Sequence, residues 1–300
     1  VGSVLVESSG GVVAWNGDVQ TRNGGVDLSG AATIDLTGND GADFVVDTDD
    51  VEDAGAAGAI DFGGVTVDAS GIDVTLDASG EGADADGDVD VPVGMTAGSP
   101  AASLTVSGRQ IRVPGVVTDG AGGISITADA GDDDPDTPTA VDIELSGSLV
   151  SETGGDGPAG PIEVASGGGD DLLQLLGGGA VEIDARGSPD SGVTIGVPIQ
   201  DAGGADSLLI AGSRVDVNAD LAAAQITVIA TDGGGTGVDI AAVTVDSLGA
   251  DLVLAGAELT IDPGATLTGG GGTATLRMRG DLASRSIGLG SGAAGADVAI

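Results

Sequence analysis

The sequence predicts an all-β protein, a right-handed parallel β-solenoid with about 20 to 22 residues per turn. Three observations predict this fold. A strand–glycine–strand motif recurs, its copies are spaced by whole numbers of such turns, and the chain has almost none of the aromatic rings that fill a globular core. Val, Ile and Leu alternate with polar residues at period two throughout, which is typical of strands with one buried face.

The clearest motif is SLTVSGRQIRV at 103–113, in which two short alternating runs meet at Gly108. It is repeated as SLLIAGSRVDV at 207–217 and as DLVLAGAELTI at 251–261, with Gly212 and Gly256 at the same place. A glycine at a fixed place indicates a sharp corner, where a Cβ atom would clash or φ must be positive. We therefore expect these three glycines to stack in register as corners of one coil.

The spacing of the copies supports a common period. Leu208 follows Leu104 by 104 residues, and Leu252 follows Leu208 by 44 residues. Both intervals fit a unit of roughly 21 to 22 residues, as five turns and then two. The whole chain would then make roughly 13 to 15 turns, a rod of roughly 65 to 70 Å. The expected core ladders include Leu104, Val106, Leu208, Ile210, Leu252 and Leu254.

Along the chain, short strands are predicted at 4–6, 12–15, 32–36 and 44–46, and alternation resumes over 59–76. The Asp- and Gly-rich stretches 79–100 and 131–139 are predicted to protrude as acidic loops; the second also has two prolines, which do not fit a central strand. Strands follow closely from 162 onward, except that DLAAAQ at 220–225 favours one helical turn. We interpret 1–300 as one continuous solenoid, and as a segment of a longer protein because both ends resemble interrupted repeats.

Composition restricts the partners and the compartment. The net charge is −40, which disfavours nucleic acid and anionic membrane surfaces, since both attract basic proteins. Glycine accounts for 58 residues, and the aromatic residues are Trp15, Phe44 and Phe62, so the core must be aliphatic. The absence of cysteine excludes disulfides and thiol chemistry, and no stretch has the length of a transmembrane helix.

The residue types argue against an enzyme. The chain has no His, Cys, Lys or Tyr, so the usual general base, thiolate nucleophile and Schiff-base amine are missing. A carboxylate pair for glycoside cleavage is the remaining catalytic alternative, as in the pectin-cleaving β-helices. Those enzymes usually add basic and histidine partners, which this chain does not supply. The sequence therefore predicts a protein without catalytic residues.

Four aspartates are candidate calcium ligands: Asp43, Asp171, Asp206 and Asp239. Two of them belong to GNDGADFVV at 38–46 and GGTGVDIAA at 234–242, which resemble the calcium-binding nonapeptide of secreted RTX proteins. GGGDDLL at 167–173 and GGADSL at 203–208 are partial copies. Glycine carbonyls and a carboxylate suit a hard cation. In the alternative reading, each motif only makes a tight corner before a strand. We expect the coil to fold without a cofactor. The motifs leave both alternatives standing, a bound calcium ion or a tight corner alone.

The stretch 103–130, together with MRGDLASRSIGLGSG at 278–292, resembles bacterial exoproteins of the filamentous-haemagglutinin type. The resemblance implies a non-catalytic extracellular or cell-surface rod used for adhesion or matrix building. The partners that it implies are further segments of the same long chain or copies of it, and cell-surface glycans or proteins. The alternatives are a calcium-stabilised RTX-like module and a carbohydrate-active β-helix enzyme that uses carboxylates.

Overall fold

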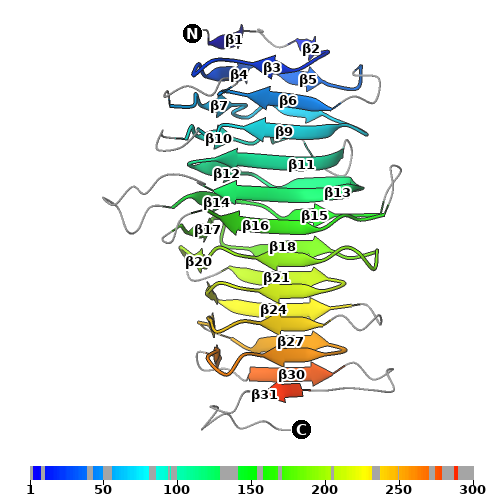
Figure 1. Cartoon of the computed structure of the whole chain (residues 1–300), viewed down its shortest axis with the longest axis vertical. Helices are drawn as coiled ribbons and strands as arrows, with labels where there is room; N and C mark the ends of the chain where they lie inside the picture. The colour runs from blue at the N-terminus through cyan, green and yellow to red at the C-terminus, as the bar shows by residue number, and fades with distance from the viewer. Residues whose placement is uncertain are drawn as a thin grey trace.

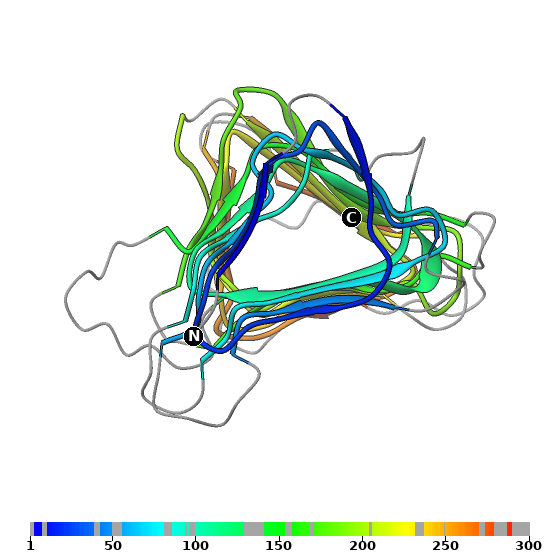
Figure 2. The same ribbon diagram turned by 90° about the horizontal axis from the view of Figure 1, so that it is seen from above.

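The structure, a computed structural model, describes residues 3–7, 11–38, 43–49, 56–80, 86–93, 95, 100–128, 141–153, 158–167, 171–203, 206–231, 237–248, 250–269, 274–278 and 287–289. All elements in these ranges are strands, and every pairing between them is parallel apart from two isolated bridges. In the same ranges no helix is long and apolar enough to cross a membrane. The chain forms a three-sided coil (Figures 1 and 2).

Face 1 is one eleven-stranded sheet with one strand per turn. Its strands are β1 (Val4–Glu7), β4 (Val26–Gly30), β7 (Ile60–Asp61), β10 (Val89–Asp90), β12 (Ile111–Val113), β14 (Ile143–Leu145), β17 (Leu173–Leu175), β20 (Ile199–Asp201), β23 (Leu221–Ala223), β26 (Thr244–Ser247) and β29 (Thr266–Gly269).

Face 2 is built in the same way. Its strands are β3 (Val19–Gln20), β6 (Phe44–Asp47), β9 (Asp73–Asp77), β11 (Ala101–Gly108), the second half of β13 (Val116–Ala128), β16 (Ile162–Ser166), β19 (Val193–Ile195), β22 (Val215–Val217), β25 (Val238–Ile240), β28 (Leu259–Ile261) and β31 (Ile287–Leu289).

Face 3 starts with β2 (Val12–Ala14), β5 (Thr33–Asp35) and β8 (Thr66–Asp68). It continues with the first half of β13, β15 (Leu149–Ser151), β18 (Ala180–Ala185), β21 (Ser207–Gly212), β24 (Gln225–Ala230), β27 (Leu252–Gly256) and β30 (Ala274–Met278). Viewed from the N-terminal end, the chain recedes clockwise through faces 1, 3 and 2, so the coil is right-handed (Figure 2). The predicted solenoid is confirmed.

The period of the coil follows from the register of face 1. Val4 pairs with Val26, Val89 with Ile111 and Ile199 with Leu221, which gives a turn of about 22 residues in each case. Other turns are longer, and the one from Val26 to Ile60 takes about 34 residues. The predicted unit therefore describes the shortest turns of face 1, and the extra residues of the longer turns lie between the strands. On face 3 a still shorter turn joins Leu208 to its partner Ile226, about 18 residues on.

The core is a set of aliphatic ladders. All six predicted core residues are at most 1 % exposed. Leu208, Ile226 and Leu252 form one ladder on face 3, two turns from end to end, as the spacing of the motif copies predicts. Leu104 is different, because it lies on face 2 in a ladder with Val74 and Ile124.

Gly108 is therefore not equivalent to Gly212 and Gly256, and that part of the prediction was wrong. It ends a strand of face 2, before the corner to face 1, whereas the other two end strands of face 3. All three lack a positive φ. Their common feature is a close approach, since an added Cβ would lie 2.8, 2.7 and 3.0 Å from the nearest carbonyl oxygen, respectively.

Two further expectations were incorrect. Within the stretch 79–100, predicted to protrude, residues 86–93 contain β10, and Val89 and Val91 are buried in the core. Residues 81–85, 94 and 96–99 of this stretch lie outside the described residues. The helical turn predicted at 220–225 is instead β23 and the start of β24, because Leu221 and Ala223 alternate into the core and pair with the next turn. The loop predicted at 131–139 lies outside the described residues.

Candidate functional site: a pocket on face 1 and the aspartate corners

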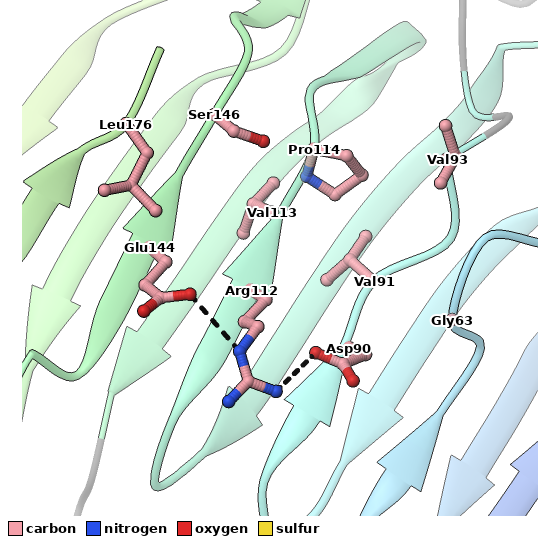
Figure 3. A pocket seen from close by; sticks show the side chains of 10 residues that line it. All are labelled: Gly63, Asp90, Val91, Val93, Arg112, Val113, Pro114, Glu144, Ser146 and Leu176. Atoms are coloured by element: carbon pink, nitrogen blue, oxygen red, sulfur yellow. Dashed lines mark hydrogen bonds and ion pairs between the residues drawn. The ribbon is translucent and has the colours of Figure 1, made fainter.

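A shallow pocket of about 260 Å³ lies on face 1 toward its corner with face 3 (Figure 3). Its lining comes from five successive turns, because each turn contributes the same positions to the same side of the coil. Charged side chains form one row, and apolar or small side chains form a second row beside it (Figure 3). The lining residues are Gly63, Asp90, Val91, Val93, Arg112, Val113, Pro114, Glu144, Ser146 and Leu176.

Arg112 is the centre of the charged row. Alternation in β12 buries Ile111 and Val113 and turns Arg112 outward, between Asp90 of β10 and Glu144 of β14. Its Nη1 donates to Asp90 Oδ1 at 3.0 Å, and its Nε donates to Glu144 Oε2 at 3.2 Å. The hydrogen bond to Asp90 and the charges of both carboxylates raise the pKa of Arg112 above its ordinary value.

The row continues toward the N-terminus as a ladder of carboxylates. Asp27, Asp61 and Asp90 are register partners on β4, β7 and β10. Partial burial raises the pKa of Asp61, and the charges of Asp90 and Asp27 raise it further. Like charges in direct register destabilise a sheet, so this ladder favours a counter-charge.

The pocket presents oxygen acceptors on either side of one guanidinium. Such a row suits hydroxyl-bearing or cationic groups and repels anions. Glycoside cleavage needs one carboxyl group that holds a proton for the leaving oxygen. Asp90 and Glu144 instead share one cation, so the geometry supports binding better than proton transfer.

Asp206 is a structural residue of the corner before β21. It is 1 % exposed, and its carboxylate accepts a hydrogen bond from the Gly179 amide of the preceding turn. Its own amide donates to Asp201 Oδ2 at 2.7 Å. These contacts agree with the alternative interpretation of the GGADSL motif, in which it only makes a tight corner before a strand.

The other calcium candidates lie apart. Asp171 is buried before β17 and accepts a hydrogen bond from the Ser166 hydroxyl. Asp43 is exposed before β6, and Asp239 is exposed in the middle of β25. Motif residues 39–42, 168–170, 204–205 and 234–236 lie outside the described residues. Within the described ranges no group of three or more His, Cys, Asp or Glu side chains is placed to hold a metal ion. Calcium ligation by these aspartates stays a prediction.

Many other aspartates close the ends of strands. In the sequence pattern Asp-x-Ser/Thr, the carboxylate accepts hydrogen bonds from the backbone amide and the hydroxyl of the residue two places on. Asp35 makes both contacts with Thr37, at 2.9 and 2.6 Å, and they lower its pKa. Asp27, Asp68 and Asp77 accept the same two hydrogen bonds, from the amide and the hydroxyl of Ser29, Ser70 and Ser79, respectively. Part of the acidity of the chain is therefore a requirement of its corners.

Sequence reasoning missed the Arg112 row. The signal was present as apolar–charged–apolar triplets at IDF (60–62), VDV (89–91), IRV (111–113) and IEL (143–145). Only the register shows that these triplets stack.

No protein-family model, characterised protein or solved structure matched the chain in comparisons with known proteins.

Proposed function

We propose that the chain is a non-catalytic extracellular rod, a stiff spacer or fibre segment of a large bacterial surface or secreted protein. The supporting observation is the continuity of face 1, in which eleven strands pair one after another, turn by turn, with a register shift in the first pair, β1 and β4. With about 4.8 Å per turn, ten steps give a rod of about 48 Å. This rod is shorter than the sequence predicts, because several turns are longer than the shortest unit.

The surface agrees with this role. Outward positions of faces 1 and 2 carry Asp, Glu, Thr, Ser and Gln in register, for example Thr75, Thr105 and Ser125. A solvated acidic exterior keeps a rod soluble and apart from anionic surfaces. The resemblance to filamentous-haemagglutinin-type exoproteins supports a location outside the cell and an adhesive or matrix role.

A distance measurement tests the rod. Asp27 and Thr268 are outward residues of one face 1 ladder, nine register steps apart, so spin labels there should lie about 43 Å apart in a narrow distribution. The chain has no cysteine, so Asp27→Cys and Thr268→Cys place the labels cleanly.

Deleting residues 89–110 removes one whole turn, since Val89 and Ile111 are register partners. The shortened chain should fold and bring the labels about 4.8 Å closer. Loss of folding, a broad distribution, or turnover of a polysaccharide by the intact chain would contradict the proposed role.

Calcium stabilisation is the second candidate. The observation in its favour is the ladder of Asp27, Asp61 and Asp90, where burial, and after it the charges of Asp90 and Asp27, raise the pKa of Asp61. The three carboxylates do not form a metal cage, but a divalent cation beside any one of them would relieve the repulsion. Calcium chloride should then raise the melting temperature more than sodium chloride of equal ionic strength. Equal shifts would reduce the effect to screening.

A further inference from the structure

The pocket on face 1 offers hydrogen-bond donors and acceptors in one row. Arg112 contacts one oxygen of Asp90 with Nη1 and one oxygen of Glu144 with Nε. Its other terminal nitrogen, Nη2, makes no hydrogen bond with any residue that the structure describes, and 51 % of its side chain is exposed. The side chains of Asp90 and Glu144 are 29 and 37 % exposed. A ligand in the pocket therefore meets N–H groups between carboxylate oxygens.

The second row of the pocket is apolar and uncovered. Val93, Pro114 and Leu176 lie on the side toward face 3 (Figure 3), and Val93 is 47 % exposed. Pro114 and Leu176 are each followed by a glycine with positive φ, Gly115 and Gly177. Glycine adds no side chain that could cover the row, so an apolar surface of a ligand can rest on it. Apolar contact beside a few polar groups is typical of ligand sites.

The charge pattern of the row disfavours both anions and cations. An anion would lie between the carboxylates of Asp90 and Glu144, in a chain of net charge −40. A cation would face the guanidinium of Arg112, whereas Asp27 and Asp61, farther along the same row, attract it without that repulsion. A neutral hydroxyl group meets neither penalty, because it can donate to a carboxylate and accept from the guanidinium.

Carbohydrate is the class of ligand that combines these properties. A sugar ring carries hydroxyl groups at its edge and C–H groups on its faces, which match the charged row and the apolar row, respectively. The pocket volume of about 260 Å³ is slightly below the roughly 300 to 1,000 Å³ of ligand clefts, so the pocket holds only a short part of a sugar chain. We propose that this pocket binds a neutral oligosaccharide through hydroxyl contacts with Asp90, Arg112 and Glu144.

The polar row continues beyond the pocket toward the C-terminal end of the coil. Gln174 and Gln200 are the next register partners of Glu144, and both turn outward between buried neighbours. Their amides donate and accept hydrogen bonds, at steps of about 4.8 Å along the rod. The oligosaccharide should therefore lie along the rod, and a pentasaccharide should bind more tightly than a disaccharide of the same linkage.

NMR titration of the intact chain measures the binding. The probes are the pentasaccharides of cellulose, chitin, mannan and amylose, which are neutral and differ in linkage and substituents. At least one of them should bind at millimolar concentration. Arg112→Met should weaken that binding about tenfold or more, because hydrogen bonds to a charged group are lost. Leu176→Ala should weaken it about threefold or more, because apolar contact is lost.

Arg214→Met is the matched control. Arg214 is 55 % exposed and pairs with Asp216 on face 2, away from the pocket, so the variant removes the same charge and should leave binding unchanged. The chitosan pentasaccharide, which has amines where chitin has acetamides, tests the charge argument. Its attraction to the acidic chain should fall as salt is added, and Arg112→Met should strengthen that attraction or leave it unchanged.

Binding of no neutral pentasaccharide, or equal binding by the native chain and the Arg112→Met variant, would overturn the site. Binding of chitosan alone would also overturn it, because the occupant would then be a cation. The inference deepens the adhesive part of the proposed role and rests on it. The two can fail separately: the label distance between residues 27 and 268 tests the rod, and shortened probes would contradict only the non-catalytic role.

Discussion

The corner glycine Gly108 offers the most direct test of how the coil is packed. Replacing it with alanine adds a Cβ 2.8 Å from the Gly87 carbonyl oxygen and 2.8 Å from Val89 Cγ2. Neither atom moves easily, because the oxygen accepts the Arg109 amide at 2.9 Å and Val89 is fully buried. Overpacking of this kind costs about 1 to 3 kcal/mol. The lower chain entropy of alanine in the unfolded state offsets about 0.4 to 1 kcal/mol.

We expect Gly108→Ala to lower the free energy of unfolding by about 1 to 2 kcal/mol. At roughly 2 to 4 °C per kcal/mol, the melting temperature falls by about 2 to 8 °C. Urea titration followed by far-ultraviolet circular dichroism measures the first quantity, and a thermal scan measures the second.

Gly64→Ala is the matched control, since an added Cβ there meets nothing within 4 Å and φ is not positive. It should be neutral or slightly stabilising. Gly256→Ala should cost less than Gly108→Ala, because its nearest contact is 3.0 Å and the next is 3.5 Å. Equal effects of the Gly108 and Gly64 variants would refute the close-approach explanation of the corner.

Three further predictions concern the charged residues. Arg112→Met should lower the free energy of unfolding by about 1 kcal/mol or less, since the ion pairs are half exposed, and the loss should shrink in urea titrations at acidic pH. Asp61→Asn should raise the melting temperature at neutral pH, because the raised pKa of Asp61 means that its ionised form is unfavourable in the folded state. This gain in melting temperature should disappear as the pH falls below the pKa that Asp61 has in the unfolded chain. Asp206→Ala should cost about 1 kcal/mol because it removes the hydrogen bond from the Gly179 amide of the preceding turn, at an exposed residue that water can reach. Asp206→Asn, which keeps an acceptor, should cost less in the same titration, and a calcium-dependent loss would instead support ligation.

The sequence was sufficient to predict the coil because the information is local. Alternation identifies the strands, and the interval from Leu208 to Leu252 gives two turns of one ladder. It was not sufficient to assign faces. All three sides use the same strand and corner pattern, and turns of unequal length shift the phase, so Leu104 was placed on the wrong side.

The candidate site depends on a different kind of information. The pairing of Arg112 with Asp90 and Glu144 joins residues 22 and 32 positions apart, and no motif in one turn contains it. The aspartates singled out by glycine-rich motifs show the opposite case. Asp206 has the local pattern of a ligand, yet its carboxylate accepts a hydrogen bond from the Gly179 amide of the preceding turn, and its own amide donates to Asp201.

Because the turns of face 1 keep register whatever their length, groups attached to the corners can take only axial positions that differ by multiples of about 4.8 Å. A longer or shorter corner changes the residues exposed at that turn without changing the axial position of any other turn. Insertions can therefore alter the display at one level independently, while whole-turn additions change only the overall reach.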